Sequence, residues 1–287
     1  MGGQESKPKE EKTTWDGRKF NVGEELFRGV TPGIIYAAKP GKEDQKPPIR
    51  HTIFGANTVV AKELRKALAR ADISLRFRFV HDKYIPKQLF ESDETWMVDY
   101  TNKEAVDYMI NGSSHVYMLN EFEYATRVWK DKWPTFVKLV VESCIKHKAK
   151  LIFLDNDMVY ATSDLGNMTE ESKEDPESKK GKVRKECCEI IMNHIKSGKL
   201  TAMIVRAAEM YGPWMKEKHT KLMVMIYKRL WVGGVAEWPF TVAKKQSFTY
   251  ALDAGKAIAL LALANDSYNQ VGRSTIIYLT IPYTNTF

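Results

Sequence analysis

The sequence has few cysteines and no long apolar run, and both absences limit the class of protein. Its three cysteines in 287 residues are Cys144, Cys187 and Cys188, whose spacing forms neither a disulfide framework nor a metal motif. Adjacent cysteines rarely bond each other, so we expect reduced thiols in an intracellular compartment. No apolar run reaches the length of a membrane span, and no secretory signal precedes the first polar residues.

A single basic tract is also missing, although the net charge is +8. The 36 acidic residues are mixed with the basic ones along the chain, so the charge indicates only a general preference for acidic ligands or surfaces. We therefore predict no nucleic-acid partner. The scattered histidines lack the spacing of metal ligands, and we predict no metal site.

Residues 1–48 form an extension whose first part gives no core-forming pattern. The first six residues, MGGQES, fit the N-myristoylation pattern with Gly2 as the acceptor, and the alternative is a plain polar terminus. One acyl chain anchors only reversibly, so we predict membrane contact only if Gly2 is acylated. Hydrophobic residues between Trp15 and Tyr36 suit a tail that lies along a surface, and we predict protein partners through this extension.

Strands alternate with helices from about residue 49 onward. The pattern predicts strands over 52–54, 74–80, 96–99, 115–119, 150–154 and 201–205, and helices over 59–70, 103–111, 134–147, 179–197, about 221–230 and 253–264. This alternation predicts an α/β protein with a doubly wound parallel sheet of Rossmann type and a small C-terminal substrate-side part. The predicted domain covers residues 49–287, with substrate-side insertions mainly after residue 211.

The stretch from His51 to Arg70 has the pattern of a strand, a tight turn and a helix, which suits a phosphate. Of the three small residues of a dinucleotide turn, Gly55 is present, Thr58 replaces the second and Ala61 the third. Alanine is ordinary at the third place, but Thr58 occupies space where the backbone approaches a pyrophosphate. We predict cofactor contacts from Gly55, Asn57, Thr58, Val59 and Val60; the alternative is any βα unit with a glycine in its turn.

Asp82 follows the second predicted strand, where a carboxylate can accept hydrogen bonds from a ribose. A solvent-facing turn residue is the alternative. A carboxylate repels a 2′-phosphate and so favours NAD over NADP, but His81 and Lys83 beside it weaken that preference.

Six segments in order resemble the short-chain dehydrogenase/reductase superfamily, in its atypical and extended branches of NAD-dependent epimerase/dehydratase-like proteins. The segments are IFGANTVVAKEL, VDYTNKEAV, KLIFLDNDMVYA, PESKKGKVRKE, IVRAAEMYGP and FTYALDAGKAIALLAL. The resemblance implies a Rossmann domain that binds NAD or NADP and a smaller substrate-binding part. We also predict cofactor contacts from Asp99, Tyr100, Leu119 and Asn120.

The resemblance further implies a tyrosine that passes a proton, a lysine four residues later that lowers its pKa, and a hydroxyl that holds the substrate oxygen. These places fall on Lys180, Arg184 and Asn156, so all three are substituted. An arginine keeps the positive charge but does not deprotonate. The basic run from Lys180 to Lys185 has an alternative interpretation, as a solvated surface or a contact for an acidic partner.

These substitutions favour a Rossmann protein without the usual redox chemistry, acting as a structural or nucleotide-stabilised subunit of a larger assembly. Accessory subunits of that kind occur in the superfamily. The alternative is an active NAD(P)-dependent epimerase, dehydratase or reductase on a sugar-like or small carbonyl substrate. A third hypothesis is a membrane-surface protein tethered through Gly2. The cofactor is NAD, NADP or none.

Overall fold

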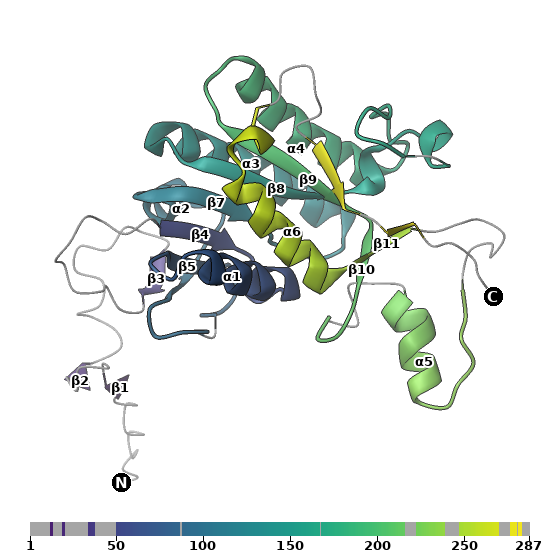
Figure 1. Ribbon diagram of the computed structural model, residues 1–287, viewed down its shortest axis with the longest axis horizontal. Helices are drawn as coiled ribbons and strands as arrows, with labels where there is room; N and C mark the ends of the chain where they lie inside the picture. The colour runs from purple at the N-terminus through teal and green to yellow at the C-terminus, as the bar shows by residue number, and fades with distance from the viewer. Residues whose placement is uncertain are drawn as a thin grey trace, which may run out of the picture.

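The computed structural model describes residues 50–86, 88–166, 168–215, 222–238 and 247–269, together with the backbone of short strands at 12–13, 19–20, 34–37, 276–279 and 281–282. Its central feature is a sheet of eight strands in the order β12-β9-β8-β7-β4-β5-β6-β3 (Figure 1). All neighbours pair in parallel except β3, which runs antiparallel to β6 at one edge. The predicted doubly wound α/β fold is confirmed.

The first half of the domain runs outward from the centre of the sheet and then returns. Its elements are β4 (Arg50–Phe54), α1 (Val59–Ala71), β5 (Arg76–His81), β6 (Glu94–Val98), α2 (Lys103–Ile110) and β7 (Ser113–Met118). Because β7 pairs with the other side of β4, the order of strands reverses between these two strands. In open α/β sheets, ligands bind at the carboxyl ends of the strands where this reversal occurs.

The second half extends the sheet in the opposite direction. Its elements are α3 (Thr126–His147), β8 (Lys150–Asn156), the 3₁₀ turns η1 (Asp157–Val159) and η2 (Thr162–Asp164), α4 (Lys179–Lys196), β9 (Ala202–Ala207), α6 (Ala251–Leu263), η5 (Asn265–Ser267) and β12 (Ile276–Leu279). A helix starting at Pro134 is wrong, because α3 begins eight residues earlier. Trp129 and Trp133 are buried in line with Phe136, Val137 and Val140, so one apolar face continues through the proline.

Helices cover both faces of the sheet, and each face has its own core (Figure 1). Side chains of α2, α3 and α4 pack on one face around Met109, Phe136 and Ile191. Those of α1 and α6 pack on the other around Leu64 and Ile258. Continuous apolar burial on both faces explains why β8 and β9 carry almost no alternation in sequence.

The remaining elements lie outside this layered body, except β3, which is the edge strand of the central sheet. They are β1 (Lys12–Thr13), β2 (Lys19–Phe20), β3 (Ile34–Ala37), β10 (Glu209–Tyr211), the π-helix η4 (Leu222–Tyr227), α5 (Lys228–Trp231), β11 (Ser247–Tyr250) and β13 (Ile281–Pro282). Within the predicted N-terminal extension, the backbone of β3 adds an edge strand to the chain's own sheet. Strands β10, β11 and β13 form a separate small sheet, in keeping with a reduced C-terminal part. Gly2 lies outside the described residues.

A pair of buried imidazoles lies at the opposite end of the sheet from the strand carboxyl ends. The rings of His51 and His115 stack at 4.6 Å, and Nδ1 of His51 lies 2.8 Å from the hydroxyl of Tyr117. Burial, reinforced by mutual repulsion, lowers the pKa of His51 to about 3, and burial with the charge of Lys150 lowers that of His115 to about 4. The folded protein therefore holds both rings neutral.

Stability is expected to fall between pH 7 and pH 5. Because the folded pKa of His51 is below the unfolded value of about 6.5, the unfolded chain binds the proton first, and His51 alone costs about 2 kcal/mol over this interval. Urea unfolding at the two pH values measures the loss. His51→Phe should flatten the pH dependence by about half; an equal slope in the variant and the wild type would contradict the assignment.

Candidate functional site

The turn after β4 lies where the strand order reverses, and Gly55 has a positive φ of 86° there. Its N–H donates to the carbonyl of Val80 at 3.0 Å. A Cβ on Gly55 would lie 2.4–2.5 Å from the backbone of Asn120 and Leu119. Only glycine fits this close approach of two strand ends, so the turn keeps the tight geometry that a dinucleotide site requires.

Thr58 has a different role from the glycine it replaces. It is the N-cap of α1, and its hydroxyl accepts a hydrogen bond from the N–H of Ala61 at 3.1 Å. The hydroxyl thus uses one of the first helical N–H groups, which in a phosphate site face the ligand. Val59 and Val60 are buried in the core under α1 and support the turn, and Asn57 is half-buried beside them.

Tyr100 fills the space beneath this turn. Its ring stacks on Phe136 at 4.3 Å, and its hydroxyl donates to the carbonyl of Val80 and accepts from the N–H of Gly55. Burial raises the pKa of Tyr100 well above its ordinary value, and the charge of Asp82 adds to the rise. Asp82 therefore lies close to the turn, as a ribose-binding carboxylate requires. Asp99 is exposed, and its carboxylate accepts hydrogen bonds from the N–H and hydroxyl of Thr101, so it shapes its own loop.

Asn120 offers a buried side-chain amide next to the turn. It follows β7 directly after Leu119, whose N–H donates to the carbonyl of Phe54. The side chain of Asn120 is buried, and neither its amide nitrogen nor its oxygen has a hydrogen-bond partner in the described part of the chain. Leaving such a group unsatisfied costs about 1–3 kcal/mol. The Gly55 turn, Asp82 and the amide of Asn120 thus fit a dinucleotide, whereas Thr58 disfavours one.

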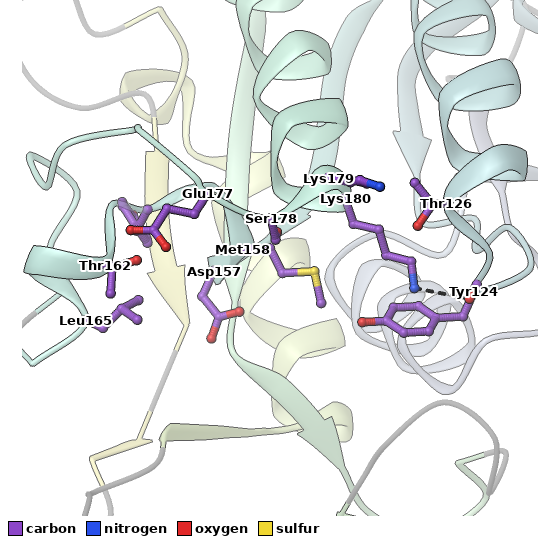
Figure 2. A pocket seen from close by; sticks show the side chains of 11 residues that line it. Tyr124, Thr126, Asp157, Met158, Thr162, Leu165, Glu177, Ser178, Lys179 and Lys180 are labelled. Carbon is purple, nitrogen blue, oxygen red and sulfur yellow. Dashed lines mark hydrogen bonds between the residues drawn. The ribbon is translucent and has the colours of Figure 1, made fainter. Parts of the chain in front are cut away.

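A pocket of about 590 Å³ opens at the carboxyl end of β8. Figure 2 shows Lys180 extending over the ring of Tyr124 on one side, with the carboxylates of Asp157 and Glu177 on the other. The ammonium of Lys180 lies 2.9 Å from the centre of that ring and donates to the carbonyl of Tyr124 at 3.1 Å. Partial burial lowers the pKa of Lys180, and burial raises that of Tyr124, so the phenol is not activated as a base.

Asn156 ends β8 and directly precedes Asp157, which lines this pocket. Its side-chain oxygen accepts a hydrogen bond from the N–H of Met158 at 3.0 Å and caps the short helix η1. The oxygen is therefore used within the protein, while the amide nitrogen keeps the capacity to donate to a carbonyl.

Arg184 turns away from the pocket into the core, where only 2% of its surface is exposed. Its Nε donates to Asp155 at 2.7 Å and its Nη2 to the carbonyl of Leu154 at 2.8 Å, while the rings of Trp133 and Phe153 flank the guanidinium. Arg184, which the sequence analysis expected at the lysine place of the family, is therefore held inside the protein.

A second arginine completes this buried cluster. Arg206 of β9 is fully buried and donates to Asp155 at 3.0 Å and to Glu174 at 2.7 Å. The thiol of Cys188 also donates to the carboxylate of Asp155, at 3.1 Å. Burial alone would raise the pKa of Asp155, but the charges of the two arginines outweigh it and lower that pKa.

Sequence reasoning missed Arg206 and Tyr124 as members of these sites. A signal for Arg206 exists in the sequence, because a charged residue interrupts the otherwise apolar strand β9 and must find a buried partner. No local pattern marks Tyr124, whose contact with Lys180 spans 56 positions. The described residues contain no cluster of His, Cys, Asp or Glu that could hold a metal ion, and no described helix is long and apolar enough to cross a bilayer.

Several solved structures share this fold at low sequence identity. The dTDP-glucose 4,6-dehydratase DesIV from Streptomyces venezuelae, solved with NAD and TYD, superposes with a TM-score of 0.66 at 15% identity over 80% of this chain and 75% of its own. The UDP-glucose 4-epimerase of Thermus thermophilus in complex with NAD gives a TM-score of 0.62 at 17% identity over 81% of this chain and 78% of its own.

A UDP-galactose 4-epimerase structure gives a TM-score of 0.65 at 16% identity, over 82% of this chain and 77% of its own. No curated protein sequence matches the chain significantly. The model of the NAD dependent epimerase/dehydratase family matches residues 51–273, which is most of the chain. The chain therefore belongs to the NAD-dependent epimerase/dehydratase family, within the extended short-chain dehydrogenase/reductase superfamily.

Proposed function

We propose that this protein binds a nicotinamide dinucleotide for stability and does not carry out the redox chemistry of its family. The observation that carries this proposal is the position of Arg184, held by Asp155 and the carbonyl of Leu154 inside the core. A guanidinium in that place neither touches a cofactor nor lowers the pKa of a neighbouring phenol. A protein of this kind serves as a structural subunit of a larger assembly, docked through its N-terminal extension.

The proton relay lacks its donor as well. Bound NAD or NADP would supply a hydride acceptor or donor, and the reaction also needs a side chain that passes a proton to or from the substrate oxygen. At the tyrosine place stands Lys180, whose ammonium is held against the ring and carbonyl of Tyr124. Asn156 can hold a substrate oxygen through its amide, but it cannot transfer a proton.

Three features of the turn support nucleotide binding. Gly55 keeps the close backbone approach, Asp82 lies beside it, and the buried amide of Asn120 has no protein partner in the described residues. The structural neighbours DesIV and the Thermus thermophilus epimerase are described with NAD. A ligand that binds only the folded state stabilises it by RT ln(1 + L/Kd), where L is the free ligand concentration, so the stabilisation grows with the logarithm of that concentration.

A second candidate function is an active epimerase, dehydratase or reductase, and one observation favours it. Lys180 lies in a pocket at the carboxyl end of β8, and partial burial lowers its pKa. A lysine with a lowered pKa gives up its proton more readily, so a variant mechanism would use Lys180 as the acid–base group together with Asn156.

Thr58→Gly is expected to strengthen NAD binding several-fold, because it frees the N–H of Ala61 and the space of the side chain for a pyrophosphate. Calorimetric titration with NAD and NADP measures the change. The matched control is Asn102→Ala, which removes the N-cap of α2 and costs a similar ~1 kcal/mol of stability without touching the turn.

Two results separate the alternatives. If neither the wild type nor Thr58→Gly binds NAD or NADP, dinucleotide binding is refuted. If the NAD(P)-loaded wild type converts a nucleotide sugar at a rate that Lys180→Ala abolishes, the non-catalytic proposal is wrong and the second candidate is correct.

A further inference from the structure

A short hairpin projects from the C-terminal part of the domain. The π-helix η4 and α5 form its first arm, Gly233 and Gly234 turn the chain, and the following residues return along it (Figure 1). The N–H of Glu237 donates to the carbonyl of Met225 at 3.0 Å, and Glu237 forms an ion pair with Arg229. These contacts hold the two arms together, so the tip has a defined shape.

None of the described residues from 222 to 238 is buried. The tip exposes large apolar side chains on consecutive positions, with Trp231 exposed at 91% and Val235 at 80%. The exposed apolar members are Val224, Tyr227, Leu230, Trp231, Val232 and Val235. Contiguous apolar exposure of this kind on a soluble domain marks a surface that binds something else.

The segment that leads to the tip is basic, although Glu237 on the returning arm pairs with Arg229. The described arm from Leu222 to Val232 carries Lys228 and Arg229 and no acidic residue. The preceding six positions, KEKHTK, add three lysines and one glutamate in sequence. Tryptophan, tyrosine and leucine next to lysine and arginine are the composition that binds the interface of an anionic bilayer.

The composition of the tip favours a lipid surface over a protein partner. Exposed apolar side chains at positions 230, 231, 232 and 235 stand close in sequence to Lys228. Lipid headgroups carry phosphates that pair with such a cation, and acyl chains cover apolar side chains without a matching binding site. We propose that residues 222–238 form a membrane-surface anchor, which inserts Trp231 and its apolar neighbours into the interface of an anionic bilayer while Lys228 contacts lipid phosphates.

This proposal is independent of dinucleotide binding and of Gly2. Full-length protein made in bacteria without an N-myristoyltransferase carries no acyl chain, so any lipid affinity belongs to the chain itself. Co-sedimentation is measured with vesicles of phosphatidylcholine alone and of phosphatidylcholine with about 30% phosphatidylserine. We expect binding to the anionic vesicles and at least about fivefold weaker binding to the neutral ones.

Variants test whether the hairpin is responsible. Trp231→Ser and Lys228→Glu should each weaken binding to anionic vesicles by about fivefold to tenfold. Ile73→Ser is the matched control, because Ile73 is 90% exposed at the end of α1 and should not change binding. Circular dichroism and a thermal melt establish that each variant is folded.

Three outcomes would overturn the proposal. One is the absence of binding to either vesicle. Another is equal binding by Trp231→Ser and the wild type. The third is a concentration-dependent dimer, detected by light scattering, that Trp231→Ser dissociates without any lipid effect; the tip would then contact a second copy of the chain.

Discussion

Gly55→Ala is expected to destabilise the protein by about 3–4 kcal/mol. About 1 kcal/mol comes from placing an L-residue at a φ of 86°, and the rest from a Cβ that would lie 2.4 Å from the backbone of Asn120. Because both atoms in that contact belong to strand ends, no side chain can rotate to relieve it. Urea unfolding at pH 7 measures the loss, and NAD binding should vanish in the same variant.

Gly198→Ala is the control for backbone strain alone. Gly198 ends α4 with a φ of 68°, yet nothing lies within 4 Å of its added Cβ. Its substitution should therefore cost only about 1 kcal/mol. Equal losses at the two positions would mean that the strand ends near Gly55 separate freely, and the description of the turn as a tight cradle would be incorrect.

Asp155→Asn is expected to destabilise the protein by about 3–5 kcal/mol, because it leaves the buried guanidinium groups of Arg184 and Arg206 without their shared carboxylate. Glu174 still pairs with Arg206, so Arg184 bears most of the loss. Chemical unfolding measures the effect. Asp175→Asn is the surface control, since Asp175 pairs with the exposed Lys173, and it should cause no measurable change.

A triple variant tests the cause of that loss. Asp155→Leu, Arg184→Met and Arg206→Met together replace the charged cluster by apolar side chains of similar length. Such replacements of whole buried ion clusters are often neutral or stabilising. We therefore expect the triple variant to recover most of the stability lost in Asp155→Asn. If the triple variant loses as much stability as Asp155→Asn, the unpaired charges are not the cause. The hydrogen-bond geometry of the cluster would then itself be needed for stability.

The buried cluster joins one helix to two neighbouring strands. Arg184 of α4 donates to Asp155 of β8, and the same carboxylate accepts from Arg206 of β9. This arrangement is consistent with our proposal that the domain was retained as architecture and nucleotide cradle.

The sequence by itself determined the fold class and the place of the nucleotide turn. Alternating apolar strands and amphipathic helices predicted the parallel sheet, and the family segments indicated which strand ends carry Gly55 and Asn156. These features are local: each depends on the periodicity of a short stretch or on a residue that only a tight turn requires. The predicted start of α3 at Pro134 is wrong, because the apolar face of this helix continues through the proline to Trp129.

Only the tertiary structure decided the direction and partners of the side chains. From the sequence, Arg184 belongs to a basic run that either binds a dinucleotide or stays at the surface, whereas in the structure it donates to Asp155, 29 positions away, in the core. The stacking of Lys180 on Tyr124, the amide of Asn120 without a partner among the described residues and the exposure of Trp231 likewise depend on the packing of the elements. Periodicity specifies which face of an element is buried, whereas the packing of elements determines which polar groups meet there and which remain open to a ligand.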